Sequence, residues 1–166
     1  LSESTLAEET LFAMQTLAET PAEIARHQRL AATQETQNGK WSLALRHLLM
    51  LLQNSSKQQF FSDGTRTVRA DVWVAGQMIE IYNRLDEAGQ LEFLEMLRTE
   101  EGPIKKNIGL HRFAQVFCFL PTGEREQLQL ALVAAQSGRH TEAITRFQRA
   151  TNYSQSANTV EAWLGM

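Results

Sequence analysis

The apolar residues of this chain recur at helical spacing, and one arrangement of them occurs twice, centred on Gly39 and Gly138. An alanine lies seven positions before each glycine, and small or apolar residues follow it at five, nine and twelve positions: Ala32, Ala44, Leu48 and Leu51 in the first copy, and Ala131, Ala143, Phe147 and Ala150 in the second. The pattern predicts a helix, a turn at the glycine and a second, antiparallel helix that crosses the first at small residues. We therefore expect helical hairpins over residues 21–53 and 122–152.

Apolar stripes of helical period predict further helices outside the two hairpins. These are expected over residues 3–18, 66–85, 86–102 and 104–120, with a short last segment around Val160 and Trp163. Residues 54–65 contain the turn signal Asp63-Gly64 and are expected to be a connection. No alternation of strand period is convincing. The predicted fold class is therefore all-α, with about eight helices in stacked antiparallel hairpins.

Capping and breaking residues set the expected helix boundaries. Thr20-Pro21-Ala22-Glu23 has the form of a capping box with proline at the first helical position. Asp86 and Thr141 are expected to cap the helices that follow them. Stops are expected at Asn38-Gly39, Gly102-Pro103 and Pro121-Thr122-Gly123.

Within the expected helices we predict which apolar residues are buried. The helix over 86–102 is expected to bury Leu91, Leu94 and Leu97. The helix over 66–85 has two apolar stripes, one with Val68, Val72, Ala75, Ile79 and Tyr82 and the other with Val74, Met78, Ile81 and Leu85.

Composition narrows the possible functions. The 166 residues contain 19 acidic and 16 basic side chains, a net charge of −3, so no general attraction to nucleic acid is expected. The single cysteine, Cys118, excludes an internal disulfide and any site with several cysteine ligands. No apolar run reaches the length needed to cross a bilayer. The chain begins at Leu1, and we interpret it as a fragment of a longer chain that forms a single domain over residues 1–166.

The residues that could support catalysis or metal binding form no recognised motif. His27 and His47 lie in one predicted hairpin and could approach each other, but a third ligand is missing, and neither His111 nor His140 has metal-site spacing. Cys118 lies within an apolar run and is expected to be an inert buried thiol. No glycine-rich phosphate loop is present. We therefore predict that the chain is not an enzyme and holds no cofactor or metal.

Two arginines, Arg66 and Arg69, open the predicted helix over 66–85, where the helix dipole disfavours positive charge. Ion pairs with Asp63 and Asp71 are the expected compensation. An anion-binding site at the two arginines is the alternative.

The two hairpins resemble tetratricopeptide repeats, with the second hairpin closer to that pattern than the first. Ala131, Gly138, Ala143, Phe147 and Ala150 match the family's small residues, turn glycine, aromatic residue and final alanine. The residues at the position of the family's usual tryptophan are Gln28 and Gln127. This resemblance implies a degenerate α-solenoid whose middle section, residues 60–120, has diverged.

The wider order of features is similar to the helical region that precedes pyrroloquinoline-quinone-like β-propeller repeats in large exported bacterial proteins. The features are Leu51-Leu52, Asp63-Gly64, Val68 to Trp73, Leu85 to Gly89 and the final hairpin. This resemblance implies an exported protein in which the helical part is an assembly module.

The tetratricopeptide resemblance also implies candidate partner-binding residues, because the first helix of each such hairpin lines the concave face. In the first hairpin these residues are Arg26, Arg29, Thr33, Thr36 and Gln37. They are polar and suited to an acidic peptide segment. In the second hairpin Leu128 and Leu132 are too apolar to face water, so we expect the helix over 104–120 or a partner to cover them.

Trp73 is a further candidate because it lies in the middle of a polar stripe on the predicted helix over 66–85. It could lie against the aliphatic stem of Arg69 or Gln77, or be covered by the connection at Phe60-Phe61. Alternatively it anchors a partner, since tryptophan is common among binding hot spots.

Two classes of function remain. The favoured one is a non-catalytic helical scaffold that binds a protein partner or an adjacent domain of its own chain. The alternative is a small-molecule or metal-binding helical domain with a pocket beneath the helix over 66–85. A pocket that is polar at its centre would favour the second class, and a tightly packed core with an open groove would favour the first.

Overall fold

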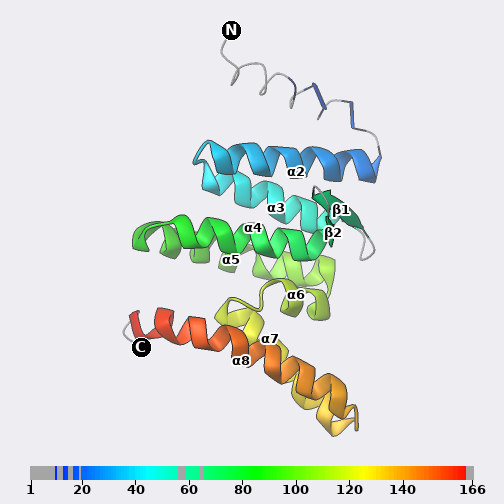
Figure 1. Ribbon diagram of the computed structural model, residues 1–166, viewed down its shortest axis with the longest axis vertical. Coiled ribbons are helices and arrows are strands. Elements are labelled where there is room, and N and C mark those ends of the chain that lie inside the picture. The colour runs from blue at the N-terminus through cyan, green and yellow to red at the C-terminus, as the bar shows by residue number, and fades with distance from the viewer. Residues whose placement is uncertain are drawn as a thin grey trace. The chain divides into compact units, whose positions relative to one another are not determined.

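The computed structural model describes the backbone of residues 10, 13, 14, 17, 18, 20–55, 59–63 and 66–163, and the side chains of these residues apart from 63, 66 and 152–163 (Figure 1). In chain order its elements are α2 (Pro21–Gln37), α3 (Trp41–Asn54), β1 (Phe60–Asp63), β2 (Arg66–Arg69), α4 (Ala70–Arg84), α5 (Glu87–Ile108), α6 (Leu110–Val116), α7 (Pro121–Gln136) and α8 (His140–Trp163). The all-α class is confirmed. The helix expected over residues 3–18 falls largely outside the described residues.

Contacts within the chain divide it into two compact units, residues 1–101 and residues 102–166, which we describe separately. In the first unit α2 pairs with α3, α3 packs against α4, and the strands β1 and β2 pair with each other beside α4. In the second unit α6 packs against α7, and α7 pairs with α8. Figure 1 shows α2 beside α3 and α7 beside α8, each pair joined by a short turn. The single domain expected from the sequence stays a prediction.

Both helical hairpins form where the repeated pattern places them. Gly39 and Gly138 each have φ +73°, a left-handed conformation that glycine adopts without the steric cost of a Cβ atom. The four alanines expected at the crossings are buried: Ala32, Ala44, Ala131 and Ala143. Small side chains therefore line both crossings, as predicted.

The start of α2 is fixed by the predicted capping box. The Glu23 backbone N–H donates to the Thr20 hydroxyl at 3.2 Å, and the Thr20 backbone N–H donates to the Glu23 carboxylate at 2.9 Å. Asp86 likewise accepts from the Gly89 backbone N–H at 2.9 Å, at the start of α5. These two caps are confirmed. The cap expected from Thr141 is wrong, because α8 begins at His140 and Thr141 lies inside it.

Residues 60–63 and 66–69 pair as two antiparallel strands, which were not predicted from the sequence. Phe61 pairs with Val68, and α4 begins at Ala70 rather than at residue 66. The alternation of strand residues places Phe61 inside and Phe60 outside, so only Phe61 covers the helices. Arg69 then lies just before α4, where its Nε donates to Asp71 Oδ1 at 3.1 Å. This ion pair is the compensation expected for Arg69.

The core of the first unit differs in detail from the predicted stripes. On α4, Val74, Met78 and Ile81 are buried whereas Val72 is exposed, so only one of the two predicted stripes is core. On α5, Leu97 is buried as predicted, but Leu91 is exposed and Phe93, which was not predicted, is fully buried. The Phe93 ring centroid lies 6.1 Å from that of Trp41 and 5.6 Å from that of Tyr82. An aromatic cluster therefore replaces part of the expected leucine stripe.

The break expected at Gly102-Pro103 does not occur, because α5 continues to Ile108. Inside a helix, proline removes a backbone donor and its ring crowds the carbonyl four residues before it. The burial of Ile104 and Ile108 after Pro103 offsets this cost and stabilises the continued helix. The helix ends instead at Gly109, which has φ +79°. The predicted helix over 104–120 therefore becomes the end of α5 and the short α6.

The ends of the second hairpin also differ from the prediction. Pro121-Thr122-Gly123, expected to separate two helices, forms the first turn of α7, with Pro121 at a position where no amide hydrogen is needed. The expected short last segment is part of α8, which runs without a break to Trp163.

Candidate functional site

One candidate residue of α2 and one of α4 meet in the first unit. The guanidinium carbon of Arg29 lies 5.0 Å from the ring centroid of Phe61 and 5.3 Å from that of Trp73. The two rings meet edge to face, with centroids 5.9 Å apart and an interplanar angle of 88°. Arg29 Nη1 also donates to the Ser62 carbonyl oxygen at 3.0 Å. We call Arg29, Phe61 and Trp73 the cation–π cluster; it joins α2, β1 and α4.

The cation–π cluster changes the interpretation of the polar face of α2. Arg29 is engaged within the chain, and the hydroxyls of Thr33 and Thr36 donate to the carbonyl oxygens four residues before them at 3.0 Å and 2.8 Å. Only Arg26 and Gln37 of the predicted set are exposed. Trp73 is half-buried and contacts the Phe60-Phe61 segment, which is one of the alternatives considered for it. Its role as a partner anchor stays a prediction.

The second unit has an exposed apolar side that spans both helices of its hairpin. Its members are 36–56 % exposed and comprise Leu128, Leu132, Ile144 and Phe147. At about 100° per residue the two leucines lie on one side of α7, and antiparallel pairing places the other two residues on the same side of α8. We call these four residues the α7–α8 apolar side. Two covers were expected for the leucines, the helix before α7 or a partner. The helix before α7 does not supply the cover, because α6 leaves both leucines exposed, and cover by a partner stays a prediction.

In the first hairpin, the residues equivalent to Ile144 and Phe147 are buried rather than exposed. Ninety-nine residues earlier, Ile144 and Phe147 correspond to Leu45 and Leu48, and both leucines are fully buried on α3, which packs against α4. Ile144 and Phe147 were not predicted to be surface residues. Aligning the two hairpins position by position would have shown apolar residues at sites that need a covering helix.

A polar pair crosses both hairpins at equivalent positions. Gln28 Oε1 lies 2.7 Å from His47 Nδ1, and Gln127 Oε1 accepts from Arg146 Nη1 at 3.2 Å. The two glutamines are buried. The hairpins therefore share an internal polar contact as well as their alanines and glycines. They resemble each other in structure as well as in sequence pattern.

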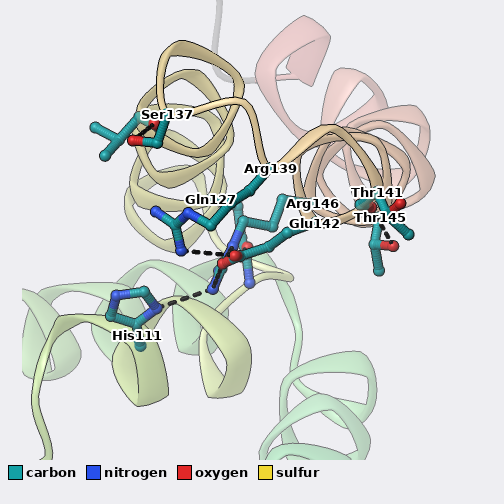
Figure 2. A network of polar contacts seen from close by, with 9 residues as sticks. His111, Gln127, Ser137, Arg139, Thr141, Glu142, Thr145 and Arg146 are labelled. Carbon is teal, nitrogen blue, oxygen red and sulfur yellow. Dashed lines mark hydrogen bonds and ion pairs between the residues drawn. The ribbon is translucent and has the colours of Figure 1, made fainter.

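In the second unit this pair belongs to a larger network, shown in Figure 2. Arg146 is 7 % exposed; its Nη2 lies 2.8 Å from His111 Nδ1, and its Nε donates to Glu142 Oε1 at 2.9 Å. Arg139 Nη1 donates to the other oxygen of Glu142 at 2.7 Å. The hydrogen bond from Arg146 is the main cause that lowers the pKa of Glu142. The network holds α6, α7 and α8 together and serves as an internal brace.

The two histidines of the first hairpin do approach each other, as the sequence suggested. The His27 and His47 ring centroids are 6.4 Å apart, and His27 is buried. Burial lowers the pKa of His47, and the charge of His27 lowers it further. Between the ordinary value of 6.5 and the lower folded value, the unfolded chain binds a proton that the folded chain does not.

Stability of the first unit is therefore expected to fall as the pH drops below about 6.5, since protonation favours the unfolded chain. The urea midpoint, followed by tryptophan fluorescence, should be lower at about pH 5.5 than at about pH 7.5. His47→Gln, which removes the titrating ring, should reduce this difference. An equal pH response in both proteins would rule out His47 as its source.

No metal site or membrane span is found in the part of the chain that the structure describes. No three His, Cys, Asp or Glu side chains there are grouped closely enough to hold a metal ion. None of the described helices is both long enough and apolar enough to cross a membrane. Cys118 is buried as expected, beside α6.

The chain matches no protein-family model, no curated protein and no solved structure. The functional interpretation therefore depends on the residues of the chain itself, and above all on the α7–α8 apolar side.

Proposed function

We propose that this chain is a non-catalytic helical scaffold that binds protein, either a separate partner or an adjacent domain of a longer chain, through the α7–α8 apolar side. The observation that carries the proposal is the exposure of four large apolar side chains on neighbouring helices: Leu128, Leu132, Ile144 and Phe147. A contiguous apolar patch of this kind on a folded domain marks an interaction surface, because burying it against a partner removes apolar area from water.

The packing of α4 supports the scaffold over a small-molecule or metal-binding domain. The residues beneath this helix, where the alternative function would place a pocket, are Val74, Met78 and Ile81, and all three are buried apolar side chains. These side chains make the centre beneath α4 apolar rather than polar, which favours a surface function. The resemblances to tetratricopeptide hairpins and to the helical regions of exported propeller proteins agree with this proposal. They extend it to a solenoid-like assembly module.

A substitution pair on α7 tests the proposal. Leu132 and Val133 are neighbours of similar exposure, 54 % and 51 %, but Val133 lies about 100° further round the helix, outside the apolar side. Leu132→Asp and Val133→Asp add the same charge to the same helix. Affinity capture of the tagged chain from its source cells, with quantitative mass spectrometry, should recover one protein with the wild type and with Val133→Asp. The amount of this protein recovered with Leu132→Asp should be lower than with the wild type by about tenfold or more.

Both variants change an exposed residue, so each should keep its thermal unfolding midpoint close to that of the wild type. If the two variants lose the recovered protein equally, or neither loses any, the α7–α8 apolar side is not the binding surface.

A further inference from the structure

We propose that the occupant of the α7–α8 apolar side is an amphipathic α-helix of another polypeptide, seated on this hairpin where α4 is seated on the α2–α3 hairpin. The inference depends on the proposed function and specifies the partner's chemistry. It follows from a comparison of the two hairpins, of which one has its covering helix and the other does not.

The hairpins are equivalent in the features that set the position of a covering helix. Both turn at a glycine with φ +73°. Both are crossed by a buried glutamine that pairs with the second helix, Gln28 with His47 and Gln127 with Arg146. Because turn, crossing and internal contact agree, each residue of the second hairpin lies in the same place relative to its hairpin as the residue ninety-nine positions earlier.

In the first hairpin a single amphipathic helix covers the equivalent side. α4 packs against α3, and its residues Val74, Met78 and Ile81 are spaced at i, i+4 and i+7 and are buried. Trp73 of the same helix lies 5.3 Å from the guanidinium carbon of Arg29, so α4 also reaches α2. This side of a hairpin therefore receives one helix that presents one apolar stripe.

Substitutions between the hairpins show where the partner helix lies. On the first helix, Arg29 and Thr33 are replaced by Leu128 and Leu132, which extends the apolar surface onto α7. On the second helix, the leucines at 49 and 52 are replaced by Gln148 and Thr151, which shortens the apolar surface on α8. A helix that buries what remains must lie over the seam between α7 and α8.

The flanking charge adds a further property of the partner. Arg125 is exposed and lies at i, i+3 and i+7 with Leu128 and Leu132, so it borders the same side of α7. It forms no ion pair in the part of the chain that the structure describes. A partner helix with an aspartate or glutamate beside its apolar stripe would pair with it.

A second copy of this chain does not supply the required helix from its own α4. The stripe of Val74, Met78 and Ile81 is already buried within each copy, so it is not free to bind another. This rules out α4 of a second copy as the covering helix. The occupant that we propose is a helix of a different polypeptide, with apolar residues at i, i+4 and i+7 and an acidic flank.

The probe for the test is a synthetic peptide with the sequence of residues 70–85, which presents the α4 stripe. A side-chain staple between positions 72 and 76, both exposed in α4, holds the peptide helical, reduces the cost of ordering it and keeps its acidic residues. Fluorescence anisotropy of the labelled peptide is measured against the full chain, its Leu132→Asp variant and its Val133→Asp variant. A peptide carrying Met78→Asp is the matched control on the probe.

We expect saturable binding to the wild type, a loss of about tenfold or more with Leu132→Asp, and a change of about twofold or less with Val133→Asp. The Met78→Asp peptide should not bind. Absence of saturable binding, or binding that Leu132→Asp leaves unchanged, would overturn the inference, the latter because the peptide would then occupy another surface.

Analytical ultracentrifugation of the chain alone tests the remaining alternative, that a second copy of the chain occupies the α7–α8 apolar side. A concentration-dependent dimer that Leu132→Asp abolishes would assign the side to a second copy and overturn the inference. If the peptide fails while capture of a native partner still depends on Leu132, the helix is the wrong occupant and the proposed scaffold function remains.

Discussion

Replacement of Phe93 with alanine is expected to lower the free energy of unfolding of the first unit by about 3–5 kcal/mol. Phe93 is fully buried on α5, and its ring contacts those of Trp41 and Tyr82. The substitution removes the apolar transfer energy of the phenyl group and leaves a cavity between α3, α4 and α5. Urea unfolding followed by tryptophan fluorescence measures the loss, because Trp41 lies 6.1 Å from the ring.

The same substitution at an exposed site provides the control. Phe60 is 57 % exposed on β1, so Phe60→Ala should change the free energy of unfolding by about 0.5 kcal/mol or less. Similar losses in the two variants would contradict the assignment of Phe93, rather than the expected leucines of α5, as the centre of this core.

Gly123→Ala is expected to cost the second unit about 1–3 kcal/mol or more, through overpacking rather than through a cavity. A Cβ atom at position 123 would lie 1.9 Å from the Phe117 carbonyl oxygen and 2.8 Å from the Cys118 backbone nitrogen. Backbone atoms cannot rotate away as a side chain does, so α7 must move from the turn after α6. Thermal unfolding followed by far-ultraviolet circular dichroism measures the loss as a lower transition midpoint.

Gly76→Ala is the matched control for this substitution. Gly76 lies inside α4, and a Cβ atom there would have no heavy atom within 4 Å. Alanine at this exposed helical position should therefore stabilise the protein by about 0.5–1 kcal/mol, the usual gain over glycine in a helix. A similar loss of stability in both variants would contradict the assignment of the Gly123→Ala effect to the close backbone contact.

The hairpins could be predicted from the sequence because short-range signals determine them. A capping box, a left-handed glycine and alanines at helical spacing act within two adjacent helices, and each signal has one physical interpretation. Gly39 and Gly138 therefore mark both turns correctly, and the small residues before and after them are buried as expected.

Elements that depend on tertiary contacts were predicted less well. Pro103 and Gly123 are both helix breakers by local preference, yet burial of Ile104 sustains α5 and a close backbone contact requires glycine in α7. The paired strands at 60–63 and 66–69 were not predicted, because four-residue strands carry too few alternating positions to be distinguished from a connection.

The candidate site was predicted in part. Leu128 and Leu132 were identified as apolar residues in need of a cover. Phe147 was expected to serve the hairpin itself, and no prediction was made for Ile144, although both are exposed. The contact between Arg29 and Trp73 joins residues of two helices and depends on the paired strands between them, so no local pattern could indicate it.

The proposed scaffold function is tested most directly by calorimetric titration of the purified captured partner against the wild type, Leu132→Asp and Val133→Asp. The α7–α8 apolar side predicts a Kd about tenfold or more weaker for Leu132→Asp and within about twofold of wild type for Val133→Asp. The two substituted residues have nearly the same exposure and differ in the side of α7 on which they lie. Equal affinities for all three proteins would contradict the account.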